Sequence, residues 1–226
     1  MSKRYMENIK NIDNLKSYDI SEAVSLLKTM KKTNFDETIE VAINLGVDPK
    51  HADQVIRGTV SLPHGTGKDV KILVIAKGDH VDAAKEAGAD YYGSEEYLDK
   101  IKGGWTDIDV IVSTPDMMVE VGKLGRVLGP RGLMPNPKSG TVTTDVSKAV
   151  NELKAGKIEF RVEKNGIVHV GIGKLSFDEN QIIENFNTFM ETIAKLKPSS
   201  LKGVYIKKIS LSSTMSPGFK INNEYH

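Results

Sequence analysis

Two stretches of this sequence concentrate the side chains that can contact phosphate. Residues 192–223 contain no acidic residue but carry six lysines: Lys195, Lys197, Lys202, Lys207, Lys208 and Lys220. Residues 121–144 contain no acidic residue either, and their four cations are Lys123, Arg126, Arg131 and Lys138. Local basic tracts of this kind can supply phosphate contacts that a total charge hides. The alternative is an ordinary solvated, lysine-rich surface.

The composition of the whole chain narrows the class of protein. Its 226 residues include 31 basic and 30 acidic ones, a net charge of only +1, which by itself argues against a strongly basic nucleic-acid binder. There are no cysteines, which excludes disulfides, thiolate zinc sites and a cysteine nucleophile. No stretch approaches the roughly 18 consecutive apolar residues of a membrane span, so we expect no membrane partner.

The sequence motifs give little support for an enzyme. No metal-ligand spacing and no GxSxG nucleophile motif accompanies the histidines, which are His51, His64, His80, His169 and His226. The Gly- and Pro-rich residues 122–138 do not contain the GxxxxGK[ST] pattern of a nucleotide-phosphate loop. We therefore expect no catalytic residue, no metal and no cofactor.

Three segments are candidates for a binding site. Residues 122–138 are predicted to form a long surface loop whose amides and cations meet phosphate, because long structureless loops are usually functional or disordered. Residues 212–218 cluster hydroxyls that suit RNA sugar and phosphate contacts, although a polar turn is the commoner structure. Residues 33–38 are the third candidate, in which Phe35 is either a core anchor or a platform for a stacked nucleotide, and burial statistics favour the core.

The elements that position these segments follow two patterns. Amphipathic helices are predicted at residues 20–31 and 178–196, and alternating strands at residues 41–45, 58–62, 158–162, 167–172 and 204–212. Between them, near-continuous apolar strands at residues 70–76 and 110–112 alternate with helices at residues 81–87 and 95–101, which is typical of a parallel sheet covered on both faces. We interpret residues 1–16 as a frayed arm.

This change of pattern predicts an inserted domain. The first and last thirds of the chain are expected to fold together, and a central α/β block of residues 68–157 interrupts them. The chain would cross between the two parts at Gly67-Lys68 and at Gly156-Lys157. Small, flexible residues at two crossings would permit a hinge.

Stretches along nearly the whole chain resemble the L-one family of large-subunit ribosomal proteins, in its bacterial form. They are residues 35–38, 57–68, 87–90, 123–138, 156–161 and 214–215, and residues 123–138 are the most specific of them. The resemblance implies an α+β protein with a discontinuous two-layer α/β-sandwich domain I, residues 1–67 plus 158–226. It also implies an inserted three-layer Rossmann-like α/β domain II, residues 68–157.

The resemblance also implies a non-enzymatic function. It indicates a structural protein that binds the side stalk of the large-subunit ribosomal RNA, assists release of exit-site transfer RNA, and represses translation of its own operon messenger RNA. Other large-subunit components would be further partners. The implied location is cytoplasmic and ribosome-associated, and off the ribosome we expect a monomer.

Family residues carry over to matching positions of this chain. The main RNA-binding surface would lie on domain I, at Phe35, Glu37, Thr38, Glu40, Lys174, Thr214, Met215 and Ser216. A secondary contact with RNA or transfer RNA would lie on domain II, at Lys123, Arg126, Arg131 and Lys138. Family members usually have glycine where this chain has Ser216, which leaves the local geometry open.

The two acidic residues of the main surface need a separate explanation. Because Glu37 and Glu40 do not attract phosphate, we expect them to accept hydrogen bonds from 2′-hydroxyls or to orient nearby cations. Two rival hypotheses remain for the chain as a whole. One is a nucleotide-dependent enzyme that uses the central α/β block, and the other is a purely structural interaction module.

Overall fold

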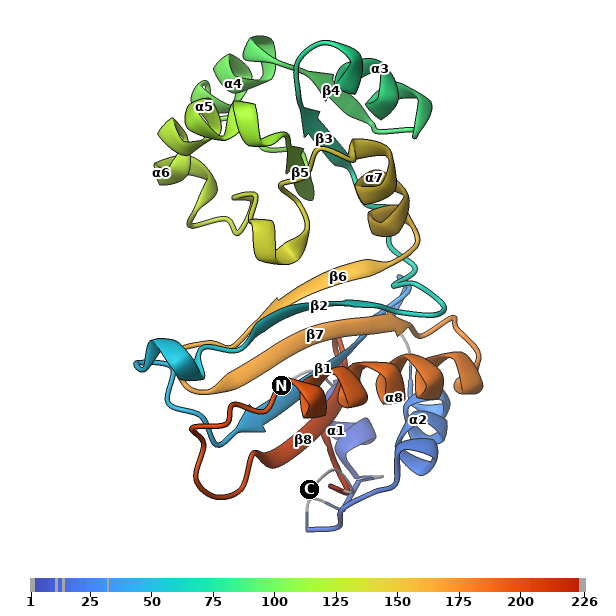
Figure 1. Cartoon of the computed structure of the whole chain (residues 1–226). Coiled ribbons are helices and arrows are strands. Elements are labelled where there is room, and N and C mark those ends of the chain that lie inside the picture. The colour runs from blue at the N-terminus through green and yellow to red at the C-terminus, as the bar shows by residue number, and fades with distance from the viewer. Residues whose placement is uncertain (1–2, 11, 14, 32, 224–226) are drawn as a thin grey trace. The chain divides into compact units, whose positions relative to one another are not determined.

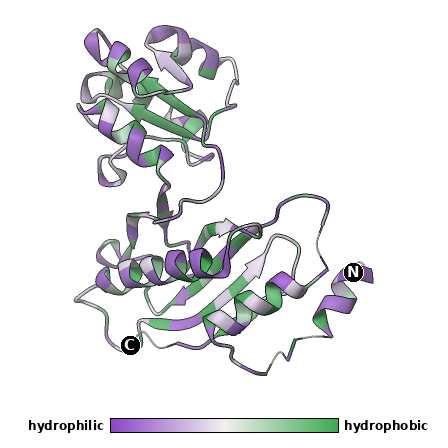
Figure 2. Cartoon of the chain, turned by 90° about the vertical axis from the view of Figure 1, so that its right-hand side faces the viewer, coloured by the Kyte–Doolittle hydropathy of each residue, from purple (hydrophilic) through white to green (hydrophobic). Residues whose placement is uncertain are grey.

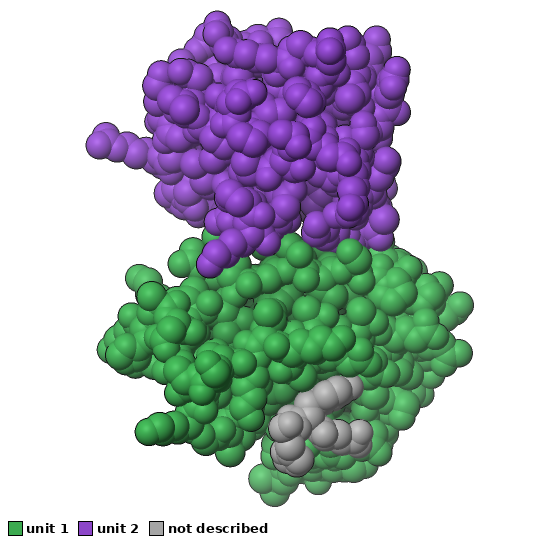
Figure 3. Space-filling model, in the orientation of Figure 1, with its two compact units in different colours: residues 1–67, 158–226 green, residues 68–157 purple. Residues whose placement is uncertain are grey.

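The computed structural model describes residues 3–10, 12–13, 15–31 and 33–223. The chain divides into two compact units, unit 1 with residues 1–67 and 158–226, and unit 2 with residues 68–157 (Figure 3). The expected mixture of helices and strands is confirmed, and Figure 1 labels the elements. None of the described helices is long and apolar enough to cross a membrane.

In its described part, unit 1 is built on an antiparallel four-stranded sheet with the order β7-β1-β8-β9. The central strand β1 (Thr38–Leu45) pairs with β7 (Ile167–Lys174) on one side and with β8 (Ile206–Ser213) on the other. The edge strand β9 (Phe219–Ile221) pairs with β8. Buried and exposed residues alternate along β1 because only one face of this sheet is covered.

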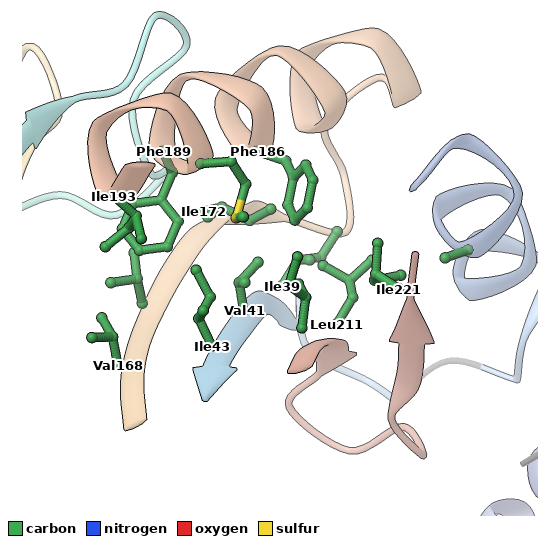
Figure 4. Close-up of a cluster of buried hydrophobic side chains, with 14 of the residues drawn as sticks. Ile39, Val41, Ile43, Val168, Ile172, Phe186, Phe189, Ile193, Leu211 and Ile221 are labelled. Atoms are coloured by element: carbon green, nitrogen blue, oxygen red, sulfur yellow. The ribbon is translucent and has the colours of Figure 1, made fainter. Parts of the chain in front are cut away.

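Helices α2 (Ile20–Thr29) and α8 (Glu179–Lys195) cover that face. Figure 4 shows how the apolar side of α8 meets the sheet, with Phe186, Phe189 and Ile193 above Val41 and its neighbours. A capping box between Asp178 and Gln181 fixes the start of α8. In Figure 2 the hydrophobic colour is concentrated on the strands and on the sides of the helices that face them.

A short second sheet belongs to unit 1 and carries the connections to unit 2. It pairs β2 (Arg57–Ser61), which precedes the first crossing, with β6 (Lys157–Arg161), which begins at the second. The Phe160 ring of β6 packs edge-on against Phe189 of α8, with 5.4 Å between the centroids. A single-turn helix, η1 (Ala52–Gln54), precedes β2.

Unit 2 has a parallel sheet with the order β4-β3-β5, formed by β4 (Tyr91–Gly93), β3 (Ile72–Ile75) and β5 (Val110–Ser113). Along β3, alternate side chains enter two different cores. Ile72 and Val74 belong to the first of these cores. Leu73 and Ile75 belong to the second.

Helices on both faces of this sheet complete unit 2. On one face lie α3 (Asp79–Glu86) and α7 (Val146–Lys154). On the other lie α4 (Glu95–Lys102), the single turn η2 (Pro115–Met117) and α5 (Met118–Lys123). The three layers explain why the strands of unit 2 are apolar on both sides.

Two sequence-based expectations about secondary structure are wrong. Residues 122–138 do not form a long loop, because they include the end of α5, then α6 (Gly125–Leu128), a turn, and η3 (Pro137–Ser139). Leu124, which lies between α5 and α6, and Leu128 at the end of α6 are both buried in the core that Leu73 and Ile75 of β3 enter.

The N-terminal arm is the second correction. Its residues 3–9 form the helix α1 (Lys3–Ile9). The Asn8 side chain exchanges hydrogen bonds with the backbone of Lys31, donating to its carbonyl at 3.3 Å and accepting from its N–H at 3.2 Å. Residues 1–2, 11 and 14 of the predicted arm lie outside the described residues.

Candidate nucleic-acid interface

The candidate residues of unit 1 gather at one end of its four-stranded sheet. In an antiparallel sheet, the start of a strand lies beside the ends of its neighbours. Thr38, which begins β1, is therefore in register with Lys174 at the end of β7. Ile39 is in register with Ser213 at the end of β8, and Thr214 to Ser216 form the turn that follows. Segments far apart in the sequence thus form one surface.

Thr38 forms hydrogen bonds with two other residues of this surface. Lys174 Nζ donates a hydrogen bond to Thr38 Oγ1 at 2.9 Å. The Thr38 N–H donates to Thr214 Oγ1 at 3.0 Å, and the Thr214 N–H donates to the Thr38 carbonyl at 3.0 Å. The cluster holds one ammonium group and two hydroxyls in fixed positions, and such groups can contact the sugar and phosphate of RNA.

Glu37 lies beneath this surface and is only 3% exposed. Its Oε2 accepts hydrogen bonds from Ser213 Oγ at 2.6 Å and from the Met215 N–H at 3.1 Å. Its Oε1 accepts from Thr33 Oγ1 at 2.9 Å and from Arg4 Nη1 at 3.4 Å. Of the two roles expected for Glu37, this geometry favours the orienting of neighbouring groups over contact with a 2′-hydroxyl.

Hydrogen bonding also determines the charge state of Glu37. Burial raises the pKa of its carboxyl, but the hydrogen bonds from Ser213, Met215 and Thr33 outweigh burial and hold the pKa below its ordinary value of 4.5. The carboxylate is therefore ionised at neutral pH. Its ion-pair partner among the described residues is Arg4, whose Nη1 lies 3.4 Å from Oε1.

Two large apolar side chains stand beside the cluster. Phe35 is 55% exposed and Met215 is 48% exposed, which is unusual for side chains of this size. The core position favoured for Phe35 by burial statistics is wrong. An exposed ring on an ordered loop suits stacking with a nucleobase, the alternative considered for this residue. The loop is ordered by Asp36, which accepts hydrogen bonds from the Ser176 N–H and hydroxyl at 3.1 and 2.7 Å.

Ser216 takes an ordinary backbone conformation, because no described residue other than glycine has a positive φ. Its hydroxyl accepts a hydrogen bond from the Ser213 N–H at 2.8 Å and donates to the Pro217 carbonyl at 2.9 Å. The turn after Met215 therefore forms without glycine. The Ser216 hydroxyl serves the turn itself.

The outward face of the sheet extends the polar surface away from Thr38. Glu40 is exposed there, and in register it lies between Gly171 and Ser212. All six lysines of residues 192–223 are exposed. Lys208 on β8 and Lys220 on β9 belong to this same sheet, so part of the basic tract reaches the surface that begins at Thr38.

The four cations expected on unit 2 are all exposed, but they stand on separate short elements. Lys123 Nζ pairs with the Glu120 carboxylate at 2.8 Å, and Arg131 contacts the Thr106 hydroxyl. Lys138 lies in η3, where its N–H is capped by the Asn136 side chain at 2.8 Å. These positions follow from the short helices and the turn that residues 118–139 form.

The two crossings between the units contain the glycines that the sequence predicts as a hinge. Gly67 and Gly156 have φ values of +67° and +99°, which side chains other than glycine rarely adopt. Lys68 pairs with Asp109, and Lys157 with Glu152, both within unit 2. The hinge itself remains a prediction.

Asn185 fixes the first crossing on the unit 1 side. Its side chain, which is fully buried, donates hydrogen bonds to the Gly65 carbonyl at 3.0 Å and to the Ile172 carbonyl at 2.8 Å, and it accepts one from the His64 N–H at 3.1 Å. The chain is thus held on α8 and β7 immediately before Gly67. Sequence patterns give no sign of this contact, since Asn185 occupies an ordinary helical position.

In the part of the chain that the structure describes, no group of three or more His, Asp and Glu side chains could hold a metal ion. His226 lies outside that part. The residues of the surface that the sequence reasoning missed are Arg4 and the hydroxyl of Thr33. Arg4 belongs to a segment interpreted as a frayed arm.

Comparison with known proteins gives consistent results. Residues 26–217 match the family described as the ribosomal protein L1p/L10e family. The chain is also 58% identical over 221 residues to the large ribosomal subunit protein uL1 of Protochlamydia amoebophila (strain UWE25), and this match covers 98% of this chain and 94% of the relative. The family match contains the whole cluster around Thr38 and begins after α1.

Proposed function

This chain belongs to the ribosomal protein L1p/L10e family, and we propose that it is a structural, non-enzymatic protein of the large ribosomal subunit that binds the side stalk of the ribosomal RNA through unit 1. The relative is named as a large-subunit protein and matches nearly the whole chain. The protein is then cytoplasmic and ribosome-associated, and other large-subunit components are its neighbours.

The observation that carries this proposal is the cluster at the end of the unit 1 sheet. Polar groups of Thr38, Lys174 and Thr214 are held together there by hydrogen bonds, and exposed Phe35 and Met215 stand beside them. RNA offers hydroxyls and phosphates for the polar groups and unpaired bases for the ring. The surface is formed before RNA arrives, so binding orders few side chains.

We assign a secondary role to unit 2. Its exposed Arg126, Arg131 and Lys138 are suited to the phosphates of exit-site transfer RNA, whose release the protein assists. The glycines at the two crossings would allow unit 2 to follow the transfer RNA.

Repression of the protein's own operon uses the same surface of unit 1. If messenger RNA and ribosomal RNA present the same folded shape, they compete for the cluster around Thr38. Off the ribosome the protein acts as a monomer, with one RNA site per chain. If the ribosomal RNA binds more tightly than the messenger, the messenger is bound only when the ribosomal RNA is saturated.

Filter binding tests the proposal with three transcripts: the side stalk of large-subunit RNA, the leader of the protein's operon, and a stem-loop of equal length and unrelated sequence. We expect tight binding to the first two, mutual competition between them, and an affinity for the stalk that falls with salt. Equal affinity for all three transcripts would reject the proposal. Binding to the stalk without competition from the leader would reject the repressor role alone.

A further inference from the structure

We propose that Glu37 is a positioning residue of the RNA-binding surface, and that Arg4 of helix α1 completes its site. The inference rests on the proposed function, because it assumes that RNA binds to the surface around Thr38. It assigns Glu37 a role without RNA contact, and it adds the N-terminal helix to the binding machinery.

Glu37 connects three segments that are separate in the sequence. Ser213 and Met215 from the end of β8 donate to one carboxylate oxygen. Thr33 from the loop before β1 and Arg4 from α1 donate to the other. The side chains that face outward from these same segments are those proposed to meet RNA. The position of the Met215 turn relative to the Phe35 loop therefore depends on one buried carboxylate.

A carboxylate is required by the chemistry of this site. Its described partners are all donors, and an ionised carboxylate only accepts hydrogen bonds. In a glutamine at this position the amide –NH2 would face donors on one side, which would leave a buried donor unsatisfied. Because only 3% of Glu37 is exposed, bulk water has little access to replace the lost partner.

Arg4 closes the site from the outside. Its second guanidinium nitrogen points toward the Met215 carbonyl at 3.5 Å, so it touches both Glu37 and the turn that Glu37 holds. Helix α1 is secured elsewhere, by Asn8 on the Lys31 backbone and by the ion pair between Glu7 and Lys31. The space left between α1 and the sheet end is a cavity of about 10 Å³, close to the smallest that holds one water.

Removing a negative charge provides a test, because the two explanations predict opposite changes in RNA affinity. Glu37→Gln and Asp36→Asn each remove one negative charge from the same loop. An asparagine at position 36 can still accept a hydrogen bond from the Ser176 N–H and donate one to its hydroxyl oxygen, so the contact that orders the Phe35 loop is kept. If charge alone matters, both variants bind RNA more tightly. We expect Asp36→Asn to bind at least as tightly as the parent chain, and Glu37→Gln to bind about tenfold more weakly or worse, which is a loss of about 1.4 kcal/mol.

The measurement is the dissociation constant for the side-stalk transcript, with the full chain, at a temperature well below the melting point of each variant. Thermal melts establish that the chains are folded, since a role in global stability alone would lower the melting temperature and leave the dissociation constant unchanged. A Glu37→Gln chain that binds like the parent overturns the inference and leaves the proposed function intact. Failure of the parent chain to bind the transcript overturns both.

Arg4 supplies a second test that does not disturb the core. Arg4→Ala and Lys3→Ala each remove one cation from α1, and Lys3 is exposed. We expect Arg4→Ala to weaken RNA binding about threefold more than Lys3→Ala, and to add little in a Glu37→Gln chain. Equal losses for the two single variants, or a full additive loss in the double variant, would mean that Arg4 acts by its charge or by direct RNA contact, and would overturn its place in the Glu37 site. If Glu37→Gln does not fold, the comparison of the two α1 variants decides.

Discussion

Thr38 and Thr214 are joined by three hydrogen bonds although 176 residues of chain separate them. Two of these bonds are 3.0 Å long, one in each direction, and the third runs from Thr214 Oγ1 to the Thr38 carbonyl at 3.3 Å. The first strand and the last turn of unit 1 thus form one surface. The whole of unit 2, residues 68–157, lies between them in the sequence.

Replacing Phe35 tests whether its ring meets a base. Phe35→Leu keeps an apolar side chain but removes the stacking face, and stacking contributes about 1–3 kcal/mol per base. We expect RNA binding to weaken by about tenfold or more in filter binding. Because the side chain is 55% exposed, the free energy of unfolding should change by less than about 0.5 kcal/mol. The matched control is Val204→Ala, which alters an exposed apolar residue near the other end of β8 and should leave binding unchanged.

Lys174 is predicted to contact a phosphate. Lys174→Met removes the ammonium that donates to Thr38 Oγ1, so the affinity for stalk RNA should fall and its dependence on salt should become shallower by about one unit of log–log slope. Lys164→Met is the control, because Lys164 is exposed in the turn that precedes the opposite end of β7. An unchanged slope for Lys174→Met, or the same change for both variants, would contradict the assignment.

Because the carboxylate of Glu37 is buried, we expect the folded protein to lose stability in acid. Burial raises the pKa of Glu37, but its hydrogen bonds hold the folded-state pKa below the ordinary value of 4.5. A group of this kind stabilises the fold fully above its unfolded-state pKa, and the contribution disappears as the pH falls through the folded-state value. Among the described residues, the charged groups near it are Arg4, at 3.4 Å, and Lys31, which lines the same small cavity.

Urea unfolding between about pH 7 and pH 3 measures this contribution. We expect the free energy of unfolding of the parent chain to decline below about pH 5, and to decline less in Glu37→Gln, which has no proton to gain. Asp36→Asn is again the control. If the parent chain and Glu37→Gln lose stability in parallel, the buried carboxylate is not the group that titrates.

The variant Gly67→Ala tests how closely side chains pack at the first crossing. A Cβ added at Gly67 would lie 2.8 Å from Lys174 Cγ and 2.8 Å from the Phe177 ring, whereas one added at Gly203 would meet nothing within 4 Å. Both glycines have a positive φ, so Gly67→Ala and Gly203→Ala share the backbone strain. We expect Gly67→Ala to cost about 1–3 kcal/mol more in urea unfolding, the usual range for overpacking. Equal costs would show that the neighbours of Gly67 move aside freely.

Much of the fold could be predicted from the sequence, because local patterns reflect burial. Val41, Ile43 and Leu45 alternate with polar residues because their sheet is covered on one face, and the run from Ile72 to Ile75 is wholly apolar because its sheet is covered on both. The change between these patterns after Pro63 falls close to the point where the chain enters unit 2.

The site was less predictable, because its decisive contacts are distant in the sequence. Arg4 meets partners 33 and 211 residues away, so no local spacing indicates its role. Burial statistics describe an average phenylalanine and predict a buried ring, whereas Phe35 is exposed. In residues 122–138 the many glycines and prolines predict a loop. The burial of Leu124 and Leu128 in the core of unit 2 nevertheless stabilises helical turns there.

The location of the main RNA-binding surface is the central claim, and one comparison of affinities tests it most directly. Filter binding to side-stalk RNA compares the double variant Thr214→Val with Met215→Ala against a chain from which residues 68–157 have been removed. We predict that the double variant loses at least about thirtyfold in affinity, roughly 2 kcal/mol, and that the shortened chain loses far less. Equal losses, or a larger loss on removal of unit 2, would contradict the assignment of the main surface to unit 1.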